Sequence, residues 1–145
     1  MTTLKILVSA CLLGVSCRYD GKSKQYKMIQ ELMKKHTLIP VCPEIMGGLA
    51  TPRLASEIKD RRVMNLTGED VTEAFERGAK ETLRLAQLYD CDLAILKENS
   101  PSCGHNKIYD GTFSGVLTAG NGVTAELLIK HGIQIIDESE IEKYL

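Results

Sequence analysis

Three of the five cysteines lie at or just beyond the ends of short apolar runs, and they are Cys11, Cys42 and Cys103. A free cysteine is usually a small buried hydrophobic residue, but loop residues flank these three. A cysteine thiolate is both a nucleophile and a ligand for soft metals. The residue types and their positions therefore predict a thiol site whose chemistry is metal binding or thiol catalysis.

The other two cysteines differ in what their surroundings indicate. Cys91 stands in the turn before an apolar strand, and we expect it to pack in the core. For Cys17 three interpretations remain open: a thiol that supports the site, a resolving thiol, or simple packing.

Polar side chains beside the thiols are suited to proton transfer. Glu44 lies two residues beyond Cys42, where it is a candidate general acid–base. Ser100 and Ser102 place hydroxyls just before Cys103. Further charges on the same loops are ordinary surface charges or site residues, and they are Arg18, Asp20, Arg53, Glu57, Lys97 and Glu98.

The number of thiols restricts the kind of metal site. The cysteines are not paired as two C-x-x-C motifs, so their spacing does not favour a zinc ribbon. Iron–sulfur clusters are commonly held by four thiolates, so three would leave one iron of a [4Fe–4S] cluster open to substrate. His105 is a candidate fourth ligand, with a solvated loop histidine as the alternative.

The apolar and helical patterns predict the elements that position these residues. Strands are expected over residues 4–10, 38–41, 93–96 and 133–136, with a further short strand over 62–66, and the apolar run of residues 4–10 is typical of a strand buried on both faces. Helices are expected over residues 24–36, 67–89, 123–131 and 138–145. The alternation predicts an α/β fold, a Rossmann-like three-layer sandwich with a mainly parallel sheet. Ligands of such folds bind beyond the carboxyl ends of the strands, where the three thiols are expected.

Two long stretches lack a regular pattern, over residues 43–60 and 98–122. Loops of this length are uncommon in compact domains unless they serve a function, so both are expected to be site loops. Within the second, Asp110-Gly111 between two β-prone pairs predicts a tight hairpin turn.

Size and charge exclude several classes of function. The 145 residues predict one domain over 1–145, and 18 basic against 19 acidic side chains give a net charge near −1. That balance offers no footprint for nucleic acid or an anionic membrane. The short apolar run at the N-terminus is not typical of a signal peptide, so we expect a cytoplasmic protein with reduced cysteines.

Several short motifs stand out around the cysteines. They are Ser9-Ala10-Cys11-Leu12-Leu13-Gly14, Cys17-Arg18-Tyr19-Asp20-Gly21, Val41-Cys42-Pro43-Glu44, Gly47-Gly48-Leu49, Pro52-Arg53 and Ser100-Pro101-Ser102-Cys103-Gly104. Together these motifs resemble a family long known as a domain of unknown function, some of whose members are thiouracil desulfidases. The resemblance extends from about residue 6 to residue 136.

The resemblance implies an oxygen-sensitive [4Fe–4S] cluster bound by Cys11, Cys42 and Cys103. It further implies a non-redox desulfidase that converts thiolated nucleobases such as 2-thiouracil, or related small thioamides, into the oxo product and sulfide. Glu44 and Ser100 would handle protons. Two alternatives stay open: a non-catalytic iron–sulfur or metal-binding protein, and a sulfurtransferase that carries a persulfide on Cys103.

Overall fold

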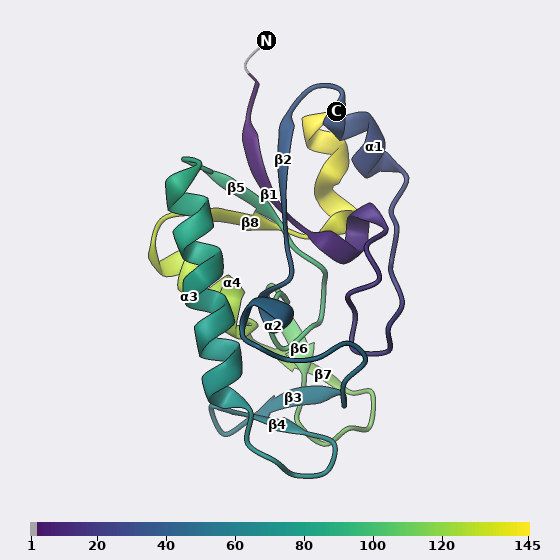
Figure 1. The fold of residues 1–145 in the computed structure, drawn as a ribbon, viewed down its shortest axis with the longest axis vertical. Coiled ribbons are helices and arrows are strands. Elements are labelled where there is room, and N and C mark those ends of the chain that lie inside the picture. Colours follow the sequence, from purple (N-terminus) through teal and green to yellow (C-terminus); the bar gives the residue numbers. More distant parts are fainter. Residues whose placement is uncertain (1–2) are drawn as a thin grey trace.

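A computed structural model describes residues 3–145, and a four-stranded parallel sheet of order β2-β1-β5-β8 forms its centre (Figure 1). The strands are β1 (Lys5–Ser9), β2 (Thr37–Val41), β5 (Leu93–Ile95) and β8 (Gln134–Ile136). Ile6, Leu7 and Val8 of β1 are fully buried, as a central strand covered on both faces requires. The predicted α/β fold with a parallel sheet is confirmed.

Helical elements cover both faces of this sheet and complete three layers. One layer is α1 (Met28–Met33) with the 3₁₀ helix η2 (Glu138–Tyr144), and the other is α3 (Thr72–Leu88) with α4 (Val123–Lys130). Ile6 and Val8 pack in the core that includes α1 and η2, whereas Leu7 packs in the core beneath α3 and α4. Consecutive side chains of β1 thus stabilise opposite layers.

Two antiparallel hairpins lie beyond the carboxyl ends of the parallel strands (Figure 1). They are β3 (Ser56–Lys59) with β4 (Arg62–Asn65), and β6 (Lys107–Tyr109) with β7 (Leu117–Ala119). Two short helices follow strands of the main sheet directly: η1 (Ala10–Leu13) after β1, and α2 (Pro43–Met46) after β2. No helix within residues 3–145 has the length and apolar character needed to cross a membrane.

The predicted short strand near residues 62–66 is confirmed as β4, which pairs with β3 and lies outside the parallel sheet. The predicted hairpin turn is wrong in detail. The second hairpin turns over residues 110–116 instead of at two residues, because Glu57 Oε1 accepts hydrogen bonds from Gly111 N at 3.0 Å and Phe113 N at 3.1 Å. Local turn preference is thus overridden by a contact from a distant segment.

Three predicted helices also differ from the structure. Helix α3 begins at Thr72 and not at Thr67, because Asn65 Oδ1 accepts hydrogen bonds from Thr67 N and Glu69 N and holds that segment in a turn. Asp70 Oδ1 instead accepts from Thr72 N at 2.9 Å at the helix start. Helix α1 begins at Met28 rather than residue 24, and the last segment is a 3₁₀ helix.

Helices α2 and α3 touch through their backbones at two glycines. A Cβ on Gly78 would lie 1.8 Å from the carbonyl oxygen of Pro43, and a Cβ on Gly47 would lie 1.9 Å from that of Ala74. Such distances leave no room for any side chain at either position. Because α2 directly follows Cys42, this contact fixes the segment that carries Cys42 and its neighbours.

We expect Gly78→Ala to lower the free energy of unfolding by about 1–3 kcal/mol, because the added methyl group overpacks the helix contact. Alanine in place of glycine ordinarily stabilises a helix by about 1 kcal/mol. A decrease in the free energy of unfolding would therefore indicate overpacking of the helix contact. Thermal unfolding measures it, with Lys80→Ala on the exposed side of α3 as the control. An unchanged or raised midpoint for Gly78→Ala would show that the two helices are not in close contact.

Candidate metal centre and active site

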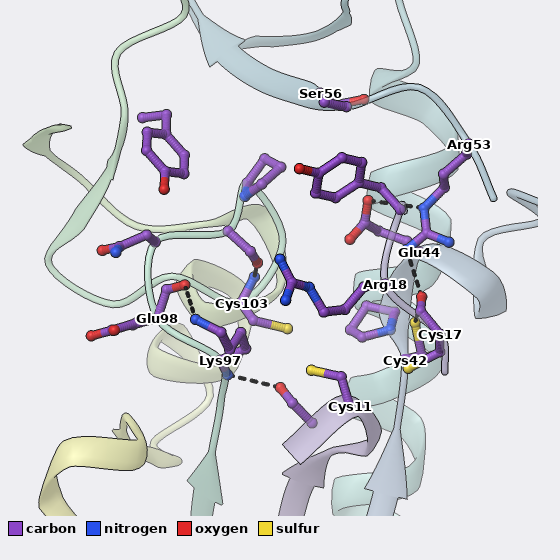
Figure 2. A pocket seen from close by; sticks show the side chains of 18 of the residues that line it. Cys11, Cys17, Arg18, Cys42, Glu44, Arg53, Ser56, Lys97, Glu98 and Cys103 are labelled. Carbon is purple, nitrogen blue, oxygen red and sulfur yellow. Dashed lines mark hydrogen bonds and ion pairs between the residues drawn. The ribbon is translucent and has the colours of Figure 1, made fainter. Parts of the chain in front are cut away.

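A pocket of about 340 Å³ lies between the carboxyl ends of β1, β2 and β5 and the two hairpins (Figure 2). Most of the predicted site residues line it, namely Cys11, Cys42, Glu44, Ser100 and Cys103. The sheet register explains this convergence, since Ser9 pairs with Val41 and Val8 pairs with Ile95. Three segments distant in sequence therefore enter the pocket at one edge of the sheet.

The three predicted ligand thiols are held by backbone turns. Cys11 lies in η1, and its carbonyl accepts hydrogen bonds from Gly14 N and Lys24 N. Cys103 N donates a hydrogen bond of 2.7 Å to Ser100 Oγ, which closes the turn that carries the thiol. The thiols of Cys11 and Cys103 point toward each other, and Cys42 lies on the side of Cys11 (Figure 2). Cys11 and Cys103 are buried and Cys42 is half-buried.

The spacing of these thiols bears on the kind of centre that they could hold. Zinc–sulfur bonds of about 2.3 Å keep the sulfurs around one ion within roughly 4 Å of each other. As they lie among residues 3–145, Cys11, Cys42 and Cys103 are not all within 4.8 Å of one another. The three sulfurs therefore do not already surround one ion, and soft thiolate ligands of this kind also bind iron–sulfur clusters.

A compact group of three oxygen ligands does occur within residues 3–145, formed by Glu98, Asp137 and Glu138. The oxygens of Glu138 are already engaged, since Oε2 pairs with Lys97 Nζ at 3.2 Å and Oε1 accepts from Glu98 N at 2.9 Å. These contacts give Glu138 a structural role, in which it holds the start of the loop that leads to Cys103.

Burial controls the protonation of the thiols in the metal-free protein. It raises the pKa of Cys103 to about 12, although hydrogen bonds with Ser9 and Ser102 act in the opposite direction. A hydrogen bond with Cys17, together with burial, raises the pKa of Cys42. Both thiols are therefore protonated at neutral pH, and a metal centre must displace their protons when it binds.

Cys17 belongs to the same group of thiols. Its side chain lines the pocket and is buried, and its carbonyl accepts a hydrogen bond from the Cys42 thiol at 3.7 Å. The interaction with Cys11 is the largest cause of the raised pKa of Cys17. Cys17 also packs in the core that includes α1 and η2, so it combines core packing with a place at the pocket. Cys91 packs in the core beneath α3 as expected.

The carboxylate of Glu44 lies at the start of α2, where it faces the pocket. Its Oε1 accepts a hydrogen bond from Arg53 Nε at 3.3 Å, and both side chains are mostly buried. Four other charged residues of the site loops also line the pocket, namely Arg18, Glu57, Lys97 and Glu98. Asp20 is not part of the lining. The sequence alone did not show whether these charged side chains lie on the surface or in the site.

The two predicted serines occupy different environments. Ser100 lines the pocket, and its hydroxyl accepts from Cys103 N. Ser102 is outside the lining and only 1% exposed, with its hydroxyl 2.9 Å from that of Thr124. His105 is likewise outside the pocket lining.

Sequence reasoning did not identify the aromatic side chains of the pocket, which are Tyr19, Tyr109 and Phe113. They come from the loop after Cys17 and from the second hairpin. Glu57 holds the turn that carries Phe113, as described above. The only sign in the sequence was that these aromatic residues stand within polar, irregular stretches. That they meet in one pocket depends on the contact between β3 and β6, which the sequence does not show.

Comparison with known proteins identifies the family of the chain. The model of the family described as 2-thiouracil desulfurase matches residues 6–140. The uncharacterized protein YbbK of Bacillus subtilis (strain 168) is 42% identical over 97% of this chain and 99% of its own length. A solved structure of the [4Fe–4S]-dependent thiouracil desulfidase TudS superposes with a TM-score of 0.90 at 43% identity, over 98% of this chain and 95% of that chain. The chain belongs to the 2-thiouracil desulfurase family.

Proposed function

We propose that this protein is an iron–sulfur-cluster-dependent, non-redox desulfidase of thiolated nucleobases such as 2-thiouracil, or of related small thioamides. The observation that carries the proposal is the meeting of three thiols from three strand ends on one pocket, beside Glu44 and Ser100. Membership of the 2-thiouracil desulfurase family and the similarity to TudS support the same reaction class.

In this proposal Cys11, Cys42 and Cys103 hold a [4Fe–4S] cluster. The fit rests on three soft donors that line one pocket and on their burial. When bound through three thiolates, the cluster supplies one Lewis-acidic iron with an open position for substrate sulfur.

The remaining pocket residues bind the substrate and move protons. Exchange of sulfur for the oxygen of water requires a base for the water proton, and Glu44 is the carboxylate placed for it. Ser100 retains its O–H as a donor while its oxygen accepts from Cys103 N. Tyr19, Tyr109 and Phe113 offer aromatic surfaces to a flat ring. Ser102 lies outside the pocket lining and supports the loop through its contact with Thr124.

The burial of Cys103 disfavours the persulfide alternative. A thiol that attacks sulfur must be partly ionised at neutral pH, but burial raises the pKa of Cys103 to about 12. A mere carrier of a cluster has no need of a lined pocket with a carboxylate and a hydroxyl beside the thiols. We therefore retain the desulfidase as the single proposal.

Anaerobically reconstituted protein is expected to convert 2-thiouracil into equal amounts of uracil and sulfide without any added reductant, because hydrolysis needs no electrons. Chromatography of the pyrimidine and a colorimetric sulfide assay measure the two products. Cys11→Ser is expected to abolish turnover, and the matched Cys91→Ser, at a core position, to retain it. A requirement for a stoichiometric electron donor would contradict the proposal.

Glu44→Gln is expected to keep the cluster and to lower kcat by about 10²–10⁴-fold, the usual contribution of general acid–base catalysis. Glutamine preserves size and hydrogen-bonding capacity but accepts no proton. Visible absorption and iron content report the cluster, and steady-state rates report the chemistry. Wild-type kcat in a fully loaded Glu44→Gln enzyme would remove Glu44 from the mechanism.

A further inference from the structure

The guanidinium of Arg53 joins three segments around the pocket. Its Nε donates to Glu44 Oε1 at 3.3 Å, and its Nη2 donates to the carbonyl of Cys17 at 2.9 Å. Its Nη1 donates to the carbonyl of Ala50 at 3.2 Å and to Thr51 Oγ1 at 3.0 Å. The side chain is only 7% exposed, so these contacts fix it in one orientation.

The contact with Glu44 engages one of the two carboxylate oxygens. Arg53 Nε reaches Oε1, whereas Glu44 Oε2 has no hydrogen-bond partner among residues 3–145. In Figure 2 the Arg53–Glu44 pair closes one side of the pocket, above Cys17 and Cys42. A carboxylate held by one oxygen, with its second oxygen unpartnered, is suited to accept a proton from a bound molecule.

The contact with Cys17 connects the same guanidinium to the thiol site. The carbonyl of Cys17 accepts from Arg53 Nη2 and, at 3.7 Å, from the thiol of Cys42. Arg53 thus holds the loop at Cys17 directly beside the thiol of Cys42.

We propose that Arg53 is a positioning residue for the reaction, which orients the Glu44 carboxylate through Nε while Nη1 and Nη2 anchor the guanidinium to the surrounding backbone. This inference rests on the proposed function. The geometry requires arginine, because only its planar fork offers donors in these directions, whereas lysine is a flexible point charge. Arg53 acts on the substrate only through Glu44.

A double-mutant cycle tests this proposal on the anaerobically loaded enzyme with 2-thiouracil. Arg53→Lys is expected to lower kcat by about 10–100-fold, with KM changed less, since small misplacement of a catalytic group has effects of this size. In the Glu44→Gln background the same substitution is expected to lower kcat by less than about twofold, because the group that it positions is gone.

The matched control is Arg62→Lys, since Arg62 Nε also pairs with a carboxylate, that of Asp70 at 2.8 Å, but on the exposed surface of the β3–β4 hairpin. It is expected to leave kcat unchanged. Iron content and the thermal unfolding midpoint of every variant are measured beside the rates, and both are expected to remain near wild type in Arg53→Lys.

Three results would overturn the positioning role. Equal losses of kcat from Arg53→Lys in both backgrounds would show that Arg53 acts independently of Glu44. Wild-type kcat in Arg53→Lys would show that orientation by the fork is not needed. Loss of iron or of folded protein in that variant would assign Arg53 to the cluster site or to the fold. Failure of the proposed function is distinct, since it appears as absent turnover in the wild type or an unaffected Glu44→Gln.

Discussion

Parallel pairing of β1 with β2 on one side and β5 on the other is the constraint on which the site depends. The register places Ser9 beside Val41 and Val8 beside Ile95, so the chain leaves all three strands at one edge. Burial of β1 in both cores fixes that register, because a shift by one residue would exchange Leu7 for its neighbours between the two layers. Hydrophobic packing thereby sets the relative positions of the three thiols, because Cys11 and Cys103 are themselves part of the two cores and Cys42 packs against one of them.

Strand ends alone place the thiols only approximately, and backbone contacts refine their positions. The approach of α2 to α3 at Gly47 and Gly78 seats the segment that follows Cys42. Ser100 closes the turn at Cys103, and Glu138 binds Lys97 and Glu98 at the start of that loop. The site is therefore held by polar and backbone interactions at the edge of an apolar scaffold, an arrangement common to α/β enzymes.

The sequence was sufficient to predict the parallel α/β fold and the strand ends at which the thiols lie, because unbroken apolar runs mark buried strands. It failed for β3, whose residues Ser56 and Glu57 break any apolar pattern, and for the turn at Asp110-Gly111, which Glu57 reshapes from a distance. The pairing of Arg53 with Glu44 was equally hidden. The local sequence indicates which secondary structure a segment prefers, whereas these features depend on contacts between polar residues that are distant in the sequence.

The placement of iron in the loaded protein tests the central claim most directly. A crystal structure of anaerobically reconstituted protein, with anomalous data collected at the iron edge, locates the metal independently of activity. We expect one four-iron centre bound by the sulfurs of Cys11, Cys42 and Cys103, with no fourth protein ligand. Iron bound in addition by Cys17 or His105, a single ion in place of a cluster, or a centre away from these three thiols would contradict the account.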